Sequence, residues 1–122
     1  MKILIAEDEP IMRKTLELRL KKDGHEVIAA ADGREALQRL SDTNPDLVIT
    51  DIMMPYASGL EIVGEVKRKS DKKIPVIILS SMGQENVVVE AFNLGADDYI
   101  TKPFSPNELS MRVKRFSILH QS

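Results

Sequence analysis

Four short apolar segments of this 122-residue chain each end at polar residues that together form one chemically coherent set. Glu7 and Asp8 follow residues 2–6, Asp51 follows 47–50, Ser80 follows 76–79, and Lys102 follows 98–101. If these segments are strands of one parallel sheet, their carboxyl ends meet at one edge, where α/β proteins bind ligands. Acids, a hydroxyl and an ammonium at that edge suit a divalent metal ion together with a phosphoryl group.

The three acids offer only hard oxygen ligands, which favours Mg²⁺ or a similar ion. Clustered carboxylates also repel each other, so they need a compensating cation. Taken alone, Glu7 and Asp8 fit better as loop residues or as acids favoured by a helix dipole. Asp51 and Lys102 at neighbouring strand ends reverse that preference, because Lys102 would attract a phosphoryl oxygen.

Two further residues have an ordinary structural interpretation beside the functional one. Ser80 can donate a hydrogen bond to the same phosphoryl group, but serine is also common where a strand ends in a turn. Tyr99, taken by itself, fits a half-buried aromatic residue of a strand. Neither residue would indicate a site without the others.

Segments of helical periodicity separate the apolar runs. The expected strands are 2–6, 27–30, 47–50, 76–79 and 98–101, and the expected helices are 10–22, 34–40, 58–69, 85–94 and a fifth from Pro106. Ser105 and Glu108 have the spacing of a capping box at the start of the fifth helix. Its inward residues are expected to be Leu109, Val113 and Phe116.

Strands that are apolar on both faces and alternate with amphipathic helices predict a parallel sheet covered by helices on each side. The predicted fold class is therefore α/β, a (βα)5 doubly wound, flavodoxin-like domain with strand order 2-1-3-4-5. In that order the first and third strands are neighbours. Asp8 and Asp51 then face each other.

The amino-acid composition excludes several classes of function for this chain. The chain has no cysteine, which excludes disulfides and thiolate zinc sites and fits a reducing cytoplasm. Its net charge of −2 gives no reason to expect nucleic-acid binding. No apolar run approaches the roughly 20 residues of a membrane span, so a cytoplasmic protein without membrane contact is expected.

Residues 1–119 resemble the receiver domain of two-component response regulators, the fold of the bacterial chemotaxis regulator. The resemblance rests on several blocks in order: Glu7-Asp8, Asp51 with Met54-Pro55 and Gly59, Ser80-Ser81, and Gly95 to Phe104. One such block alone would be a weak signal, whereas all of them at this spacing are specific. Asp97 to Tyr99 with Phe104 to Leu109 further resemble receivers attached to winged-helix DNA-binding domains.

The resemblance implies a role for each matching position. Asp51 would accept a phosphoryl group from a sensor histidine kinase, a phosphotransfer protein or a small phosphodonor. Asp8, Asp51 and the carbonyl of Met53 would bind Mg²⁺, with Glu7 acting through water. Lys102 would pair with the phosphoryl oxygens, and Ser80 would supply the switch hydroxyl. Tyr99 would be the aromatic residue that turns inward, and the peptide bond before Pro103 would be cis.

The same resemblance implies a phosphorylation-dependent switch rather than an enzyme acting on a separate substrate. Residues 1–122 would form a single receiver domain, the N-terminal part of a longer regulator. Phosphorylation would favour a symmetric homodimer through the fourth helix, fifth strand and fifth helix. We expect that contact to involve Val88 and Phe92, with Arg112 at its rim.

Three other functions fit the predicted fold. A flavin or nucleotide carrier would need a phosphate-binding loop after the first strand, but that loop is acidic here. A protein-binding module that never carries phosphate would not need the intact acids, Ser80 and Lys102. A phosphatase with an aspartyl intermediate typically has a second acid two residues after the nucleophile, where this chain has Met53.

Overall fold

The computed structural model describes residues 1–69 and 73–121 of the chain. Within these residues, five parallel strands form one sheet in the order β2-β1-β3-β4-β5, as predicted. The strands are β1 (Lys2–Ala6), β2 (Glu26–Ala30), β3 (Leu47–Asp51), β4 (Val76–Ser80) and β5 (Asp98–Thr101). Every residue of β3 and β4 is buried, which explains their continuous apolar sequence.

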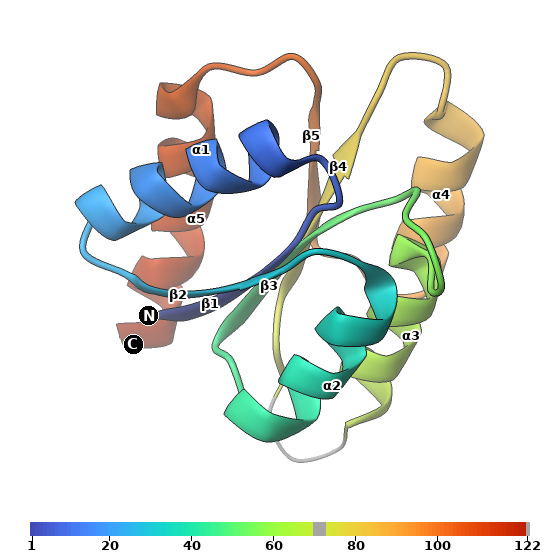
Figure 1. Cartoon of the computed structure of the whole chain (residues 1–122), viewed down its shortest axis with the longest axis horizontal. Helices are drawn as coiled ribbons and strands as arrows, with labels where there is room; N and C mark the ends of the chain where they lie inside the picture. Colours follow the sequence, from blue (N-terminus) through green and yellow to red (C-terminus); the bar gives the residue numbers. More distant parts are fainter. Residues whose placement is uncertain (70–72, 122) are drawn as a thin grey trace.

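Helices cover both faces of the sheet (Figure 1). They are α1 (Pro10–Lys22), α2 (Gly33–Thr43), α3 (Gly59–Arg68), α4 (Glu85–Asn93) and α5 (Pro106–Gln121). α1 and α5 pack on one face, where Leu109, Val113 and Phe116 are buried as expected. α2, α3 and α4 pack on the other face and form a second apolar cluster.

Strand register brings the predicted polar residues to one edge. Ala6 pairs with Thr50, and Asp51 pairs with Leu79. Ser80 pairs with Thr101 on β5. The strands therefore end at nearly the same level, and the residues that follow them lie side by side.

Side-chain caps set where several helices begin. Glu9 caps α1 by accepting hydrogen bonds from two backbone amides of its first turn. At α5, Ser105 Oγ accepts a hydrogen bond from the Glu108 amide at 3.1 Å. The Glu108 carboxylate instead lies 3.6 Å from the Arg112 guanidinium, so the expected capping box forms only its serine half.

α2 is longer than the sequence pattern predicts. Asp32 caps it one residue before Gly33, by accepting a hydrogen bond from the Glu35 amide. The helix then continues to Thr43 and ends where Asn44 adopts a left-handed conformation. Periodicity of apolar side chains did not reveal these ends, because Gly33 is buried but has no side chain, and Ser41 and Asp42 at the other end are polar and exposed.

Candidate functional site

Lys102 lies between two of the predicted acids at the carboxyl edge of the sheet. Its Nζ donates hydrogen bonds to Glu7 Oε1 at 2.6 Å and to Asp51 Oδ2 at 2.8 Å. Glu7 is fully buried, and the Asp51 side chain is 12% exposed. A single ammonium therefore compensates two carboxylates in a region of low solvent access.

Burial and neighbouring charges shift the pKa values of this cluster in opposite directions. Burial raises the pKa of Glu7 to about 7, against the lowering effect of its hydrogen bond from Lys102. Burial also lowers the pKa of Lys102, but the hydrogen bonds to Asp51 and Glu7 outweigh it, so its pKa lies above the usual value. The lysine stays charged, while the buried acid resists ionisation.

The geometry of the three acids fits a hard divalent cation. One carboxylate oxygen from each of Glu7, Asp8 and Asp51 lies within 4.8 Å of the others. Asp8 is exposed, so the group is open to solvent on that side. Because Lys102 supplies one positive charge for three acids, an additional cation would relieve the remaining repulsion.

Backbone contacts hold the phosphoacceptor candidate and the loops beside it. The Met53 amide donates a hydrogen bond to Asp51 Oδ1 at 3.3 Å. The loop after β3 folds back so closely that a Cβ on Gly59 would lie 2.3 Å from the Asp51 carbonyl oxygen. This contact requires glycine at position 59. The Lys102–Pro103 peptide bond, which leads out of β5, is cis.

Ser80 and Tyr99 lie beside the acidic cluster rather than within it. Ser80 is 2% exposed, and its hydroxyl makes no hydrogen bond in the part of the chain that the structure describes. Tyr99 is 42% exposed, and its ring meets the Phe92 ring edge-on, with centroids 5.8 Å apart. Both residues line a cavity of about 420 Å³ between α4 and β5.

Two features near the site were not predicted from the sequence. Arg13 of α1 donates hydrogen bonds to the carbonyl oxygens of Glu7 and Asp8, at 2.9 and 3.4 Å, and so fixes the turn after β1. Tyr56, in the loop after β3, has a left-handed φ of 71°, and the Arg34 guanidinium stacks 4.1 Å from its ring centroid. A bulky residue seldom adopts this conformation, so the residue type gave no signal.

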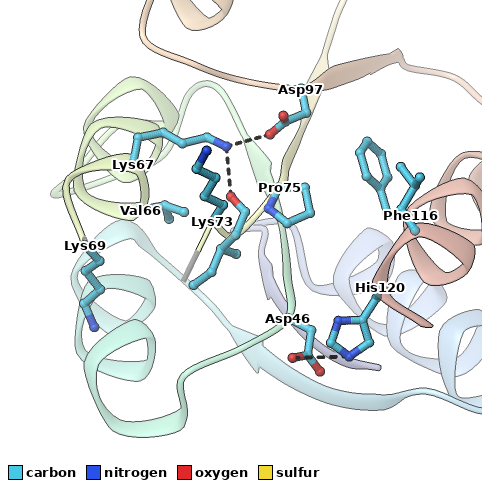
Figure 2. Close-up of a pocket in the computed structure, with 11 residues that line it drawn as sticks. Asp46, Val66, Lys67, Lys69, Lys73, Pro75, Asp97, Phe116 and His120 are labelled. Atoms are coloured by element: carbon cyan, nitrogen blue, oxygen red, sulfur yellow. Dashed lines mark hydrogen bonds and ion pairs between the residues drawn. The ribbon is translucent and has the colours of Figure 1, made fainter. Parts of the chain in front are cut away.

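A different cavity, of about 610 Å³, lies at the opposite edge of the sheet (Figure 2). Ile74, Pro75 and Asp97, which precede β4 and β5, contribute to its wall. There Lys67 Nζ donates hydrogen bonds to Asp97 Oδ2 at 2.8 Å and to the Ile74 carbonyl at 2.9 Å (Figure 2). This cavity contains none of the predicted site residues.

The structure corrects one residue of the expected contact surface. Val88 is only 8% exposed because it faces the core with Ala91, one helical turn away. Phe92 is 41% exposed, as the expected contact requires, and Val89 faces solvent in place of Val88, at 57% exposure. Among three consecutive valines, helical geometry decides which one faces outward.

Arg112, which was expected at the rim, is already paired within the chain, and so is the nearby acid Asp97. Arg112 Nη1 donates a hydrogen bond to Asp98 Oδ1 at 2.8 Å. Asp97 binds Lys67 and also accepts a hydrogen bond from the Val76 amide. In this conformation, these two acids hold β5 to α5, α3 and β4.

None of the helices described is long and apolar enough to cross a membrane.

Comparison with protein-family models gives a match to the response regulator receiver domain over residues 3–114. The probable transcriptional regulator ycf27 of Galdieria sulphuraria is 45% identical over 113 residues, which are 93% of this chain and 44% of that protein. The alkaline phosphatase synthesis transcriptional regulatory protein PhoP of Bacillus subtilis is 40% identical over 121 residues, 99% of this chain and 49% of that protein. The chain thus spans about half the length of the curated relatives it matches.

Solved structures with the same architecture include a response regulator receiver domain protein from Clostridium thermocellum. It superposes with a TM-score of 0.91 at 31% identity, covering 98% of this chain and 96% of that one. The chemotaxis response regulator CheY4 of Vibrio cholerae gives a TM-score of 0.87 at 33% identity, covering 94% of this chain and 97% of that one. Both agree with the strand order and helix arrangement described above.

Proposed function

Because this chain belongs to the response regulator receiver domain family of two-component systems, we propose that it accepts a phosphoryl group on Asp51. The donor would be a sensor histidine kinase or a phosphotransfer protein. The observation that carries this proposal is the placement of Lys102 between Glu7 and Asp51, with Asp8 alongside. The direct experiment is intact-mass measurement after incubation with acetyl phosphate and Mg²⁺, which should add one phosphoryl group.

Mg²⁺ fits the donor set. Asp8, Asp51 and the Met53 carbonyl would hold it directly, with Glu7 reaching it through water. When bound, the ion supplies positive charge that favours an anionic phosphodonor next to anionic side chains. The exposed side of the cluster at Asp8 leaves room for exchange with solvent.

The chain's own residues account for the remaining steps. A carboxylate oxygen of Asp51 forms a bond to phosphorus as the phosphorus–nitrogen bond of a phosphohistidine breaks. The electron pair of that bond goes to the leaving imidazole, which takes a proton from solvent. The raised pKa of Lys102 keeps its ammonium group charged. This group would then donate hydrogen bonds to the phosphoryl oxygens in place of the carboxylates.

We propose that the product is a conformational switch and that the chain catalyses only its own phosphorylation and dephosphorylation. The hydroxyl of Ser80, which pairs with none of the described residues, would donate a hydrogen bond to the phosphoryl oxygen and move toward it. Tyr99 would then turn from its half-exposed position into the space beside Ser80. A phosphoryl group drives this change only by the extra contacts it makes in one state.

The proposed output surface is defined here as the α4-β5 face and consists of Val89, Phe92 and Tyr99, all more than a third exposed. We propose that phosphorylation favours a symmetric dimer through this face and the adjoining part of α5. Arg112 is bound to Asp98 in the present conformation, so its use across a dimer would require that ion pair to exchange partners.

Aspartate at position 89 should prevent that dimer, because it places a charge on the proposed α4-β5 face. After beryllofluoride treatment, the wild-type domain should sediment as a dimer, and Val89→Asp should weaken dimerisation by roughly tenfold or more. Ile11→Asp is the matched control, since Ile11 is an exposed apolar residue of α1. A wild-type monomer at high concentration, or equal effects of both variants, would place the interface elsewhere.

We expect the phosphorylated form to be long-lived, because Met53 and Met82 each follow a proposed site residue, Asp51 and Ser80, by two positions and would flank the phosphoryl group. Both side chains are exposed, at 59% and 83%, and neither can orient or activate water. Met53→Asn or Met82→Glu should speed phosphate loss roughly tenfold, less than a positioned base achieves. Met111→Asn, on the exposed side of α5, should leave the rate unchanged. Unchanged or slower loss in both test variants would contradict this expectation.

A further inference from the structure

The cavity between α4 and β5 has the composition of a small-molecule site. It has a volume of about 420 Å³ and is lined by Ser80, Val88, Val89, Phe92, Tyr99 and Thr101, among others. Ligand cavities typically measure about 300–1,000 Å³ and combine apolar walls with a few polar groups. This cavity has apolar walls from α4, one carboxylate from Glu85 at the start of that helix, and hydroxyl groups from the ends of β4 and β5.

The polar end of the cavity contains a hydroxyl that no described residue pairs with. Ser80 is 2% exposed and its hydroxyl has no hydrogen-bond partner within residues 1–69 and 73–121. Ser80 is paired in register with Thr101, so two hydroxyl-bearing residues lie next to each other on adjacent strands. Thr101 is exposed, so both hydroxyls can bond to solvent, and a ligand hydroxyl at this end could take the place of that water.

The aromatic wall indicates what else the ligand should contain. The rings of Phe92 and Tyr99 meet edge-on, and each residue is about two fifths exposed. A third ring placed in the cavity could pack against both of them and against Val88. Aromatic pairs of this kind add to the gain from apolar burial.

We propose that this cavity binds a small hydroxylated aromatic compound, with its ring against Phe92 and Tyr99 and its hydroxyl toward Ser80 and Thr101. The functional consequence rests on the proposed switch. If Tyr99 turns into this space on phosphorylation, a bound ligand occupies the same volume and favours the unphosphorylated state. The effect is reciprocal, because phosphorylation must weaken ligand binding by the same factor.

The binding claim can be tested with 4-ethylphenol as the probe, followed by NMR of the isotope-labelled domain. We expect saturable shifts confined to residues 80–82, 85–92 and 99–101, with a Kd on the order of 1 mM for a ligand of this size. Phe92→Ala should weaken binding about fivefold or more by removing one wall. Leu94→Ala is the matched control: Leu94 has similar exposure at the end of the same helix and does not line the cavity.

Shifts scattered over the surface, or equal affinity of the Phe92→Ala and wild-type proteins, would overturn the site. This titration needs no phosphoryl group, so its result does not depend on the proposed function. The coupling is tested separately by the steady-state phosphorylated fraction with phosphoramidate. 4-Ethylphenol should lower this fraction about twofold or more in the wild type, and by less in Phe92→Ala at the same concentration. Binding at the cavity with no change in that fraction would overturn the competition with Tyr99. Absence of phosphorylation without any ligand would instead contradict the proposed function.

Discussion

Asparagine at position 51 is expected to abolish phosphate uptake by this domain. The amide is nearly the same shape as the carboxylate, but it is neutral and a far weaker nucleophile. The oxygen of the new side-chain amide can still accept the hydrogen bond from the Met53 amide, and Lys102 retains its hydrogen bond to Glu7. The fold should therefore persist. Intact mass after treatment with acetyl phosphate or phosphoramidate and Mg²⁺ should show one added phosphoryl group in the wild type and none in Asp51→Asn.

The matched control for this experiment is Asp42→Asn. Asp42 is an exposed acid near the end of α2, away from the acidic cluster, and its replacement makes the same change in charge. This variant should take up phosphate as the wild type does. Equal uptake by Asp51→Asn would show that another residue accepts the phosphoryl group, and peptide mapping would then identify it.

The fold could be predicted because its pattern is repeated and local. Each strand is a short apolar run that ends at a polar residue, and each helix has one apolar face. Once the strands are parallel, their carboxyl ends must share an edge. The contact of Lys102 with Glu7 and Asp51 then follows from topology, although 95 and 51 residues separate them in sequence.

The details that escaped prediction depend on side-chain direction rather than residue type. The three valines from 87 to 89 are chemically alike, and only the rotation of α4 buries Val88 and exposes Val89. The pairing of Arg112 with Asp98 likewise depends on how α5 lies against β5. A sequence pattern places such charges on a surface but does not say whether they bind within the chain or across a dimer.

The stack of Arg34 on Tyr56 escaped prediction for a different reason. Left-handed backbone conformations are predicted from glycine or asparagine, and tyrosine gives the opposite signal. The two residues come from different segments of the chain, and only the tertiary structure brings them together. Strained conformations of this kind cluster near functional sites, where local sequence preference is least informative.

In the absence of metal, the stability of this domain is expected to fall as pH rises from 5.5 to 7.5. Burial raises the folded-state pKa of Glu7 to about 7 from its usual 4.5, with Asp51 adding to the increase and Lys102 opposing it. Between these values the folded chain binds a proton that the unfolded chain has released, so increasing pH favours unfolding. The loss should be about 2 kcal/mol over this interval.

Urea unfolding in EDTA at the two pH values measures this effect, and Glu7→Gln isolates it. Burial lowers the pKa of His25, so the contribution of this histidine to stability increases with pH. Because it is the same in both proteins, it cancels when the wild type is compared with Glu7→Gln. The pH-dependent loss should be present in the wild type and largely absent from the variant. An equal pH dependence in both proteins would show that Glu7 is not the responsible group.

Mg²⁺ should reverse this loss and stabilise the domain further at pH 7.5, because a ligand that binds only the folded state adds RT ln(1 + [L]/Kd). That is about 2.7 kcal/mol when the ion is present at a hundred times its Kd. Asp8→Asn should be more stable than the wild type in EDTA, since it removes one repelling carboxylate, and should lose the response to Mg²⁺. A melting temperature that is the same in EDTA and in saturating Mg²⁺ would argue against a metal site, because the three clustered acids would then be compensated by Lys102 alone.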